Sequence, residues 1–341
     1  MRETPWFLTP RRFLRAIALG TGALGTAMLV ALACGDEPIR LLLVLRGEGT
    51  ATEREIFALV RLPRVLLAAG AGGLLGVSGA AFQSVLANPL ADPYVLGSAG
   101  GAAFAVVLIE SFAAFALGWS GRVACAILGA AVSLALVAAI VRDPLRAGVH
   151  VLVLAGVVVN AFFGAAIVLA VALLDPVGAH GAVLWMIGTL GVLPGKTEAL
   201  FSLVALLGIV LLLASLSRAA NALSMGEDGA LLLGRRAMRV RWLLLAAGTI
   251  AAGIAVGVAG PIGFVGLIVP HCVRRLAGAD HRLVFPLSAF VGAALIVLAD
   301  IPARTIVSPQ GLPVGVFTAL LGVPFFLVLL RQSQLPPRRN G

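Results

Sequence analysis

Charged side chains are scarce in this sequence. Only 12% of its 341 residues are Asp, Glu, Lys or Arg, whereas 60% are hydrophobic and the mean hydropathy is +1.08. A soluble globular domain carries about 25% charged residues, which it needs to cover its surface. The shortage of charge therefore excludes a water-soluble fold. It predicts an all-α integral membrane protein in which residues 1–341 form a single transmembrane domain.

Cysteines and clusters of metal ligands are also lacking. Cys34, Cys125 and Cys272 each lie in or beside an apolar run, without the spacing of a disulfide framework or a zinc site. His271 and His281 flank the end of an apolar run with no third ligand nearby. We interpret them as helix-end residues on the surface. We therefore expect no metal and no cofactor.

Basic residues exceed acidic ones and give a net charge of +10, yet they do not form a nucleic-acid-binding patch. They occur in short clusters between apolar runs, which is the pattern of membrane topology. The sequence LPGKT at 193–197 resembles the end of a phosphate-binding loop, but no strand precedes it, and the chain offers no nucleophile–base pair. We therefore expect neither nucleic-acid binding nor enzymatic activity, and any ATP hydrolysis would belong to another chain.

Apolar runs of membrane-spanning length follow one another along the chain, about ten in all. We predict spans ending near 34 and at 61–86, 94–117, 123–141, 149–174, 199–217, 242–258, 261–276, 283–299 and 311–330. An even number of spans puts both termini on one side, and the excess of arginine in that set of loops predicts that this side is cytoplasmic. The pentapeptide at 66–70 recurs at 244–248 in a span of opposite direction, a weak indication of an inverted repeat.

The run at 61–86 is rich in small residues. Ala68, Gly72, Gly76 and Ala80 recur at every fourth position, so one face of the helix lets neighbouring backbones approach closely. A helix surrounded by lipid has no use for such a face. We therefore predict that this helix packs in the middle of the bundle.

Carboxylates are missing from the middle of the predicted spans. Glu110, Asp175 and Asp300 are the only ones near span interiors, and Asp175 and Asp300 fall near predicted span ends. A carrier driven by an ion gradient usually needs an ionisable relay at mid-depth, for which only Glu110 could serve. Secondary transport is therefore the less favoured alternative, and a membrane enzyme is less favoured still.

The largest cytoplasmic segment between spans covers residues 218–236. Gly226 and Gly229 interrupt it, and residues 231–233 are three leucines outside any predicted span. Such a segment either rests on the bilayer surface as a helix or docks into a partner protein that covers the leucines. The residues themselves support the two interpretations equally.

Several stretches resemble the FecCD family of ABC importer permeases. They are RLPR, Gly79, Gln83, NPLADP and LG within 61–97, NALSMGEDGALLLG at 221–234, GPIGFVGLIVPHCVRRLAGADHR at 260–282, ADIPAR at 299–304 and LPVGVFTALLGVPFFLVLL at 312–330. The resemblance covers residues 61 to 330. It implies the type II ABC importer architecture of ten helices per subunit in the bacterial inner membrane. The implied cargo is a large metal chelate such as a ferric siderophore, haem or cobalamin.

The resemblance also implies partners and sites. Two permease copies would form the pathway as a homodimer in the lipid bilayer, two copies of an ABC ATPase subunit would bind below, and a periplasmic substrate-binding protein would deliver the cargo. Docking of that protein falls on Arg61, Arg64 and Arg304, whose planar guanidinium groups suit carboxylates. Coupling to the ATPase falls on Asn221, Gly226, Glu227, Ala230 and Gly234.

An inner gate is implied at Gly148, Val149 and His150, the turn before the predicted span at 149–174. A histidine in a narrow gate would make transport sensitive to pH, whereas a solvated histidine would not. The sequence also departs from the family at Gly311, where an acid usually precedes the LPxG sequence. That departure puts any role of the acid in doubt here.

Overall fold

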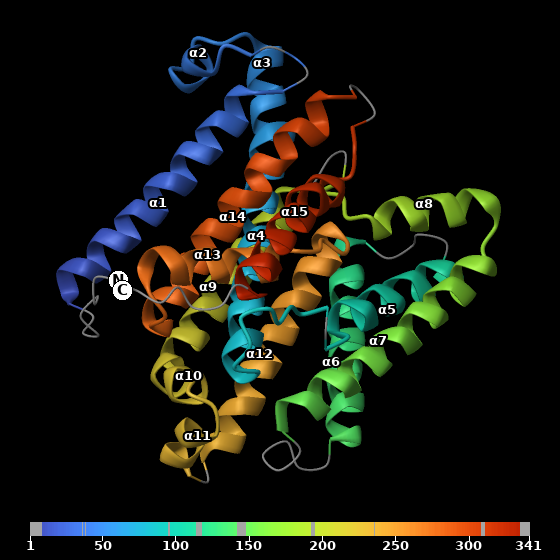
Figure 1. The fold of residues 1–341 in the computed structure, drawn as a ribbon. Coiled ribbons are helices and arrows are strands. Elements are labelled where there is room, and N and C mark those ends of the chain that lie inside the picture. The colour runs from blue at the N-terminus through green and yellow to red at the C-terminus, as the bar shows by residue number, and fades with distance from the viewer. Residues whose placement is uncertain are drawn as a thin grey trace.

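The computed structural model describes residues 9–35, 37, 39–94, 96–113, 118–141, 148–191, 195–234, 236–307 and 311–334. All regular structure in these ranges is helical, which confirms the predicted all-α class. The helices are α1 (Pro10–Ala33), α2 (Leu41–Leu45), α3 (Ala51–Glu55), the π-helix η1 (Ile56–Arg61), α4 (Leu62–Val85), α5 (Ser98–Ala113), α6 (Trp119–Ile140), α7 (Gly148–Ala172), α8 (Pro176–Met186), α9 (Lys196–Ser215), α10 (Ser217–Leu223), α11 (Glu227–Leu233), α12 (Arg236–Ala259), α13 (Val265–Ala277), α14 (His281–Thr305) and α15 (Val314–Gln334). Helices α2 and α3 lie at one end of the molecule, and α10 and α11 lie at the other (Figure 1).

Within the described residues, seven helical segments are long and apolar enough to cross a membrane. They are Pro10–Ala33, Ala51–Val85, Trp119–Ile140, His150–Ala172, Lys196–Ser215, Arg236–Ala259 and His281–Thr305. A further helix, α5, α13 or α15, lies at each remaining predicted span. The count of ten spans and the cytoplasmic position of both termini stay predictions. Helix α8 lies between two predicted spans and was not predicted from the sequence.

Two of the predicted spans begin too early. The spans placed at 94–117 and 261–276 start as helices only at Ser98 and Val265. The reason is local, because each helix follows a stretch that contains proline, and proline has no N–H to donate. The preceding stretches are NPLADP at 88–93 and GPIGF at 260–264.

The two irregular stretches meet inside the protein, where their polar groups find partners. The Gln83 side chain on α4 donates hydrogen bonds to the carbonyl oxygens of Ala91 at 3.0 Å and Gly266 at 3.1 Å. Asp92 is buried and accepts hydrogen bonds from the backbone N–H groups of Tyr94 and Leu267. Because unsatisfied backbone groups are costly away from water, these side chains let a non-helical chain lie within the bundle.

Helix α4 lies at the centre of the bundle, surrounded by α14, α12, α9 and α13. In the apolar window of Ala51–Val85, 94% of the residues are buried. A Cβ atom on Gly72 would lie 2.3 Å from the Gly292 carbonyl oxygen, and one on Gly76 would lie 2.3 Å from the Ser288 carbonyl oxygen. The backbones of α4 and α14 are therefore in direct contact along this face. Ala68 and Ala80 of the same series are fully buried.

Small residues of α4 are not confined to that face. A Cβ atom on Gly73 would lie 2.4 Å from the Leu206 side chain of α9, and one on Gly79 would lie 1.9 Å from the Gly266 carbonyl oxygen in the first turn of α13. The Ser78 hydroxyl donates to the Gly248 carbonyl oxygen of α12 at 2.6 Å. The four-residue spacing thus indicates only one of several close contacts.

The two halves of the chain are arranged alike. In each half a central helix (α4 or α12) is followed by a proline-containing stretch, a short helix (α5 or α13) and a long helix (α6 or α14). Helix α4 packs on α13 and α14, whereas α12 packs on α5 and α6, so each central helix contacts the other half. Figure 1 shows α4 and α12 running in opposite directions, which is the geometry of an inverted repeat.

We expect Gly72→Ala to destabilise the protein, because the added methyl group would collide with the backbone of α14. Overpacking of this kind costs about 1–3 kcal/mol. Gly208→Ala in α9 is the matched control, since nothing lies within 4 Å of its position and alanine favours a helix. Thermal unfolding in detergent measures both variants. Equal midpoints would show that the contact between α4 and α14 can relax at no cost.

Candidate functional site

Helices α10 and α11 form a short hairpin at the end of the molecule opposite α2 (Figure 1). We call it the coupling hairpin after the role that the resemblance of residues 221–234 leads us to expect. A Cβ atom on Gly229 would lie 1.7 Å from the Ala222 carbonyl oxygen, so the two helices touch through their backbones. Gly226 and Gly234 bracket α11 with φ angles of 78° and 52°. Glycine adopts such left-handed angles without strain, which explains both residues.

The coupling hairpin presents apolar side chains outward. Leu231 and Leu232 are 78% and 77% exposed, and Met225 in the connecting turn is 67% exposed. Ala230 is half-buried and packs toward the core. Apolar side chains that project from the end of a bundle are typical of a surface that another body covers. The side chain of Glu227 lies outside the described residues.

The side chain of Asn221 faces the interior of the protein and not the surface that a partner would contact. It donates to the Asp280 carboxylate at 2.9 Å and accepts from the His281 backbone N–H at 2.7 Å. Both partners lie at the start of α14, so Asn221 fastens the coupling hairpin to that helix. His281 is buried, which corrects its interpretation as a surface residue. The reason is this hairpin, which covers it.

Asp280 is the polar centre of this junction. It caps α14 by accepting the Arg282 N–H at 3.0 Å, and it forms an ion pair with the Arg282 side chain at 2.6 Å. Partial burial raises the pKa of the Asp280 carboxyl, but hydrogen bonds from Arg282 and Asn221 outweigh this effect and lower the pKa to about 2. The group is therefore ionised at every physiological pH, so the junction does not titrate through it.

The predicted docking arginines lie together at the opposite end of the molecule. Arg61 is 3% exposed, and its Nη1 donates to the carbonyl oxygens of Leu32 at 2.8 Å and Ala33 at 3.2 Å. Arg304 is 7% exposed and hydrogen-bonds the Ala31 carbonyl oxygen. Two of the three guanidinium groups thus contact the end of α1.

Arg64 is held by a carboxylate from its own chain. Its Nε and Nη2 bind Asp300 at 3.0 Å and 2.9 Å, while its Nη1 donates to the Gly191 carbonyl oxygen at 3.0 Å. Asp300 is buried and also lies 3.5 Å from Arg304. The sequence analysis missed this role of Asp300. The available signal was the four-residue spacing of Asp300 and Arg304 on one helix, which brings the two side chains to the same face.

The predicted inner-gate residues begin α7. His150 is exposed and lines an open cleft of about 620 Å³ together with Leu86, Asn88 and Val157. The cleft is thus bounded by the first half of α7 and by the turn that follows α4. The side chains of Gly148 and Val149 lie outside the described residues.

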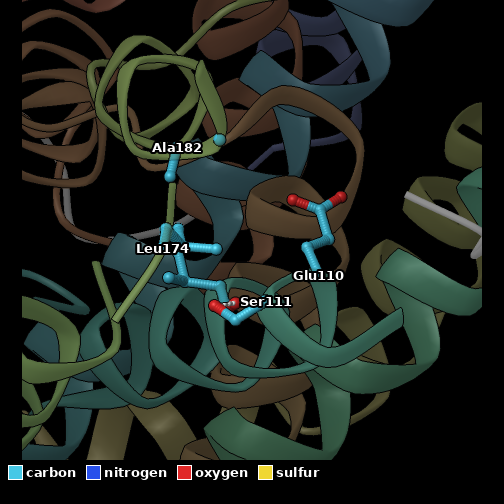
Figure 2. Close-up of a pocket in the computed structure, with 6 residues that line it drawn as sticks. Glu110, Ser111, Leu174 and Ala182 are labelled. Carbon is cyan, nitrogen blue, oxygen red and sulfur yellow. Dashed lines mark hydrogen bonds between the residues drawn. The ribbon is translucent and has the colours of Figure 1, made fainter. Parts of the chain in front are cut away.

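Glu110 lies near the far end of α5. With Ser111, Leu174 and Ala182 it lines a cavity of about 10 Å³ between α5 and α8 (Figure 2). That volume admits about one water molecule at most. Such a cavity cannot pass a substrate. Within the described residues no group of three or more His, Cys, Asp or Glu side chains could hold a metal ion.

Comparisons with known proteins agree on one class. The FecCD transport family matches residues 23–332. YvrB of Bacillus subtilis (strain 168), an uncharacterized ABC transporter permease protein, is 38% identical over 339 residues, which are 94% of this chain and 94% of that protein. The hemin transport system permease protein HmuU of Yersinia pestis is 39% identical over 286 residues, covering 83% of this chain and 84% of that protein.

Further similarities point the same way. The cobalamin import system permease protein BtuC of Halobacterium salinarum is 38% identical over 285 residues, covering 83% of this chain and 75% of that protein. A solved structure described as an inward-facing conformation of a metal-chelate type ABC transporter superposes with a TM-score of 0.80 at 29% identity. The match covers 94% of this chain and 99% of that one.

We expect Asn221→Asp to detach the coupling hairpin from α14. The change keeps the shape of the side chain but replaces the N–H donor by an oxygen that repels Asp280. Loss of a hydrogen bond to a charged group costs about 1.5–3 kcal/mol. Limited proteolysis within residues 217–234 measures the detachment. Ser224→Ala is the control, because the Ser224 hydroxyl donates within the hairpin, to the Ala220 carbonyl oxygen at 2.8 Å. Equal cleavage of both variants would contradict the anchoring role.

Proposed function

The chain belongs to the FecCD transport family, and from this premise we propose that it is the membrane-spanning subunit of an ATP-driven importer for a large metal chelate. The observation that carries the proposal is the coupling hairpin. A permease without its own ATP site must receive work through contact with a separate ATPase, and the hairpin offers a surface of the required kind. It is short, held in shape by glycines and apolar on its outer side.

The substrate class follows from the relatives. Several permeases similar to this chain carry names for hemin, cobalamin or vitamin B12, and iron(3+)-hydroxamate import. These cargoes are large metal chelates, so we propose a ferric siderophore, haem or cobalamin for this chain.

We propose that two copies of an ABC ATPase bind the coupling hairpins of two permease copies. Support for the homodimer comes from α7, where Leu154, Val157 and Phe162 are exposed apolar residues on one helix that also borders the open cleft. A second copy facing this cleft would enclose a path that one copy leaves open. His150 would then lie at the cytoplasmic mouth of that path, with Gly148 and Val149 beside it.

We also propose that a periplasmic substrate-binding protein docks at the opposite end, near Arg61, Arg64 and Arg304. Three guanidinium groups and one carboxylate, Asp300, leave this cluster with surplus positive charge. An acidic partner is therefore attracted, most strongly at low salt.

Secondary transport is the alternative, and its requirement is a titratable relay at mid-depth. Glu110, its one predicted candidate, lies near the end of α5 at a cavity of water size. Asp300 is paired with Arg64, and Asp175 begins α8. The buried carboxylate of Asp92 already accepts hydrogen bonds from the backbone N–H groups of Tyr94 and Leu267. These positions favour ATP-driven import.

We expect Leu231→Ser with Leu232→Ser to uncouple the permease without unfolding it. Both side chains are exposed, so the fold loses little, whereas the surface offered to the ATPase loses its apolar character. Leu276→Ser is the control, since Leu276 is 86% exposed at the same end of the molecule but outside the hairpin. The measurement is ATP-driven uptake in liposomes that contain the permease, its ATPase and its binding protein.

Two outcomes of that assay would count against the proposal. If the double variant and the Leu276 variant import equally well, the coupling hairpin is not the contact. Uptake driven by an imposed proton or sodium gradient without nucleotide would show that the chain is a secondary transporter.

A further inference from the structure

The C-terminal end of α1 contains carbonyl groups that need hydrogen-bond donors from outside the helix. The last carbonyl groups of any helix lack partners within the helix, and they carry the negative end of its dipole. Here those groups include the carbonyls of Ala31, Leu32 and Ala33, and the Cys34 N–H that ends the helix bonds back to Val30. Two of these residues, Ala31 and Leu32, are buried, so water does not replace the missing partners.

Two arginines from distant parts of the chain donate the missing hydrogen bonds. Arg61, at the end of η1, donates to Leu32 and Ala33 and also binds the Glu37 carbonyl oxygen. Arg304, near the end of α14, binds the Ala31 carbonyl oxygen. Planar guanidinium groups with several donors suit such a row of carbonyls, and their charge suits the dipole.

The chain leaves room for this contact at Gly35. A Cβ atom on Gly35 would lie 2.5 Å from Nη2 of Arg61, so any larger residue would displace the guanidinium group. Asp300 completes the arrangement by holding Arg64 from one side and Arg304 from the other. The cluster therefore joins α1, α4 and α14 at one end of the bundle.

The rest of α1 is weakly held. Only 22% of the residues in its apolar window are buried, and they pack mainly against α14, for example at Gly20 beside Leu287 and Phe290. At its C-terminal end, where Ala31 and Leu32 are buried, the arginine contacts add hydrogen bonds to this apolar packing.

We propose that Arg61 and Arg304 are positioning residues that clamp the end of α1 in the free permease, and that an acidic partner engages them by drawing them off its carbonyls. Docking then loosens the end of α1. Arg64 keeps its hydrogen bonds to Asp300, whereas Arg61 and Arg304 exchange the carbonyl oxygens of α1 for carboxylates of the partner. Only this last step rests on the docking role proposed above, because the clamp exists without any partner.

The native Cys34 reports on the clamp, because it ends α1 and is half-buried beside Gly35. With Cys125→Ser and Cys272→Ser it is the sole thiol. We would measure its rate of modification by a membrane-impermeant maleimide in nanodiscs. Arg61→Gln and Arg304→Gln should each raise the rate about tenfold, as expected when local opening becomes easier by about 1.4 kcal/mol. Arg54→Gln, an exposed arginine on the neighbouring α3, is the control and should leave the rate unchanged.

Two further variants separate capping from charge. Arg61→Lys keeps the positive charge but lacks the planar guanidinium group with its several donors. Cys34 should therefore be modified about as fast as in Arg61→Gln. Gly35→Ala keeps every charge and displaces the guanidinium group by contact, so it should also speed modification. This variant keeps the test open if Arg61→Gln does not fold. Parent-like rates in Arg61→Gln, Arg304→Gln and Gly35→Ala would overturn the clamp.

The displacement step is tested on the same parent protein with poly-L-glutamate as a carboxylate probe. At low salt the probe should accelerate modification of Cys34, and the effect should disappear at high salt. An equal effect of polylysine, or no effect of poly-L-glutamate, would overturn displacement. Import assays are not part of this readout, so a failure here is distinguishable from a failure of the proposed transport function.

Discussion

Direct contact between helix backbones is the constraint on which the rest of this structure depends. Helix α4 has no room for a single methyl group at Gly72, Gly76 or Gly79, because carbonyl oxygens of neighbouring helices occupy the space. Lipid provides no hydrophobic force that would press helices together, so close van der Waals contact has to hold them. The central position of α4 sets the places of α14, α12, α9 and α13, and through them the two ends where the polar sites lie.

Satisfaction of buried polar groups is the second constraint, and it follows from the first. Tight packing around α4 brings two proline-containing stretches into the bundle, where Gln83 and Asp92 supply the partners that a helix would otherwise provide. The same rule governs both ends of α14. Asn221 and Asp280 meet at its beginning, whereas Asp300, Arg64 and Arg304 meet near its end. Helix α14 thus connects the coupling hairpin with the arginine cluster by one continuous element packed on α4.

The candidate sites were predictable to different degrees. The glycines that bracket α11 and the outward leucines could be assigned from local sequence, because turn geometry and apolar exposure are properties of neighbouring residues. The inward role of Asn221 could not, since its partners lie some sixty positions away in the chain at Asp280 and His281. The arginine cluster shows the same limit. Its three arginines were predicted from the sequence, but the role of Asp300 and the contacts of Arg61 and Arg304 with the end of α1 were not.

The membrane location of this protein, the order of its long helices and its family follow from the sequence alone. The reason is that hydropathy, the positions of prolines and long specific motifs are all properties of consecutive residues. The start of α5 and α13, the presence of α8 and the burial of Arg61 and Arg304 were decided only by the tertiary structure. The physical reason is the same in each case. A polar side chain or a helix end is stable only where its hydrogen bonds are made. Inside a membrane bundle those hydrogen-bond partners come from distant parts of the chain.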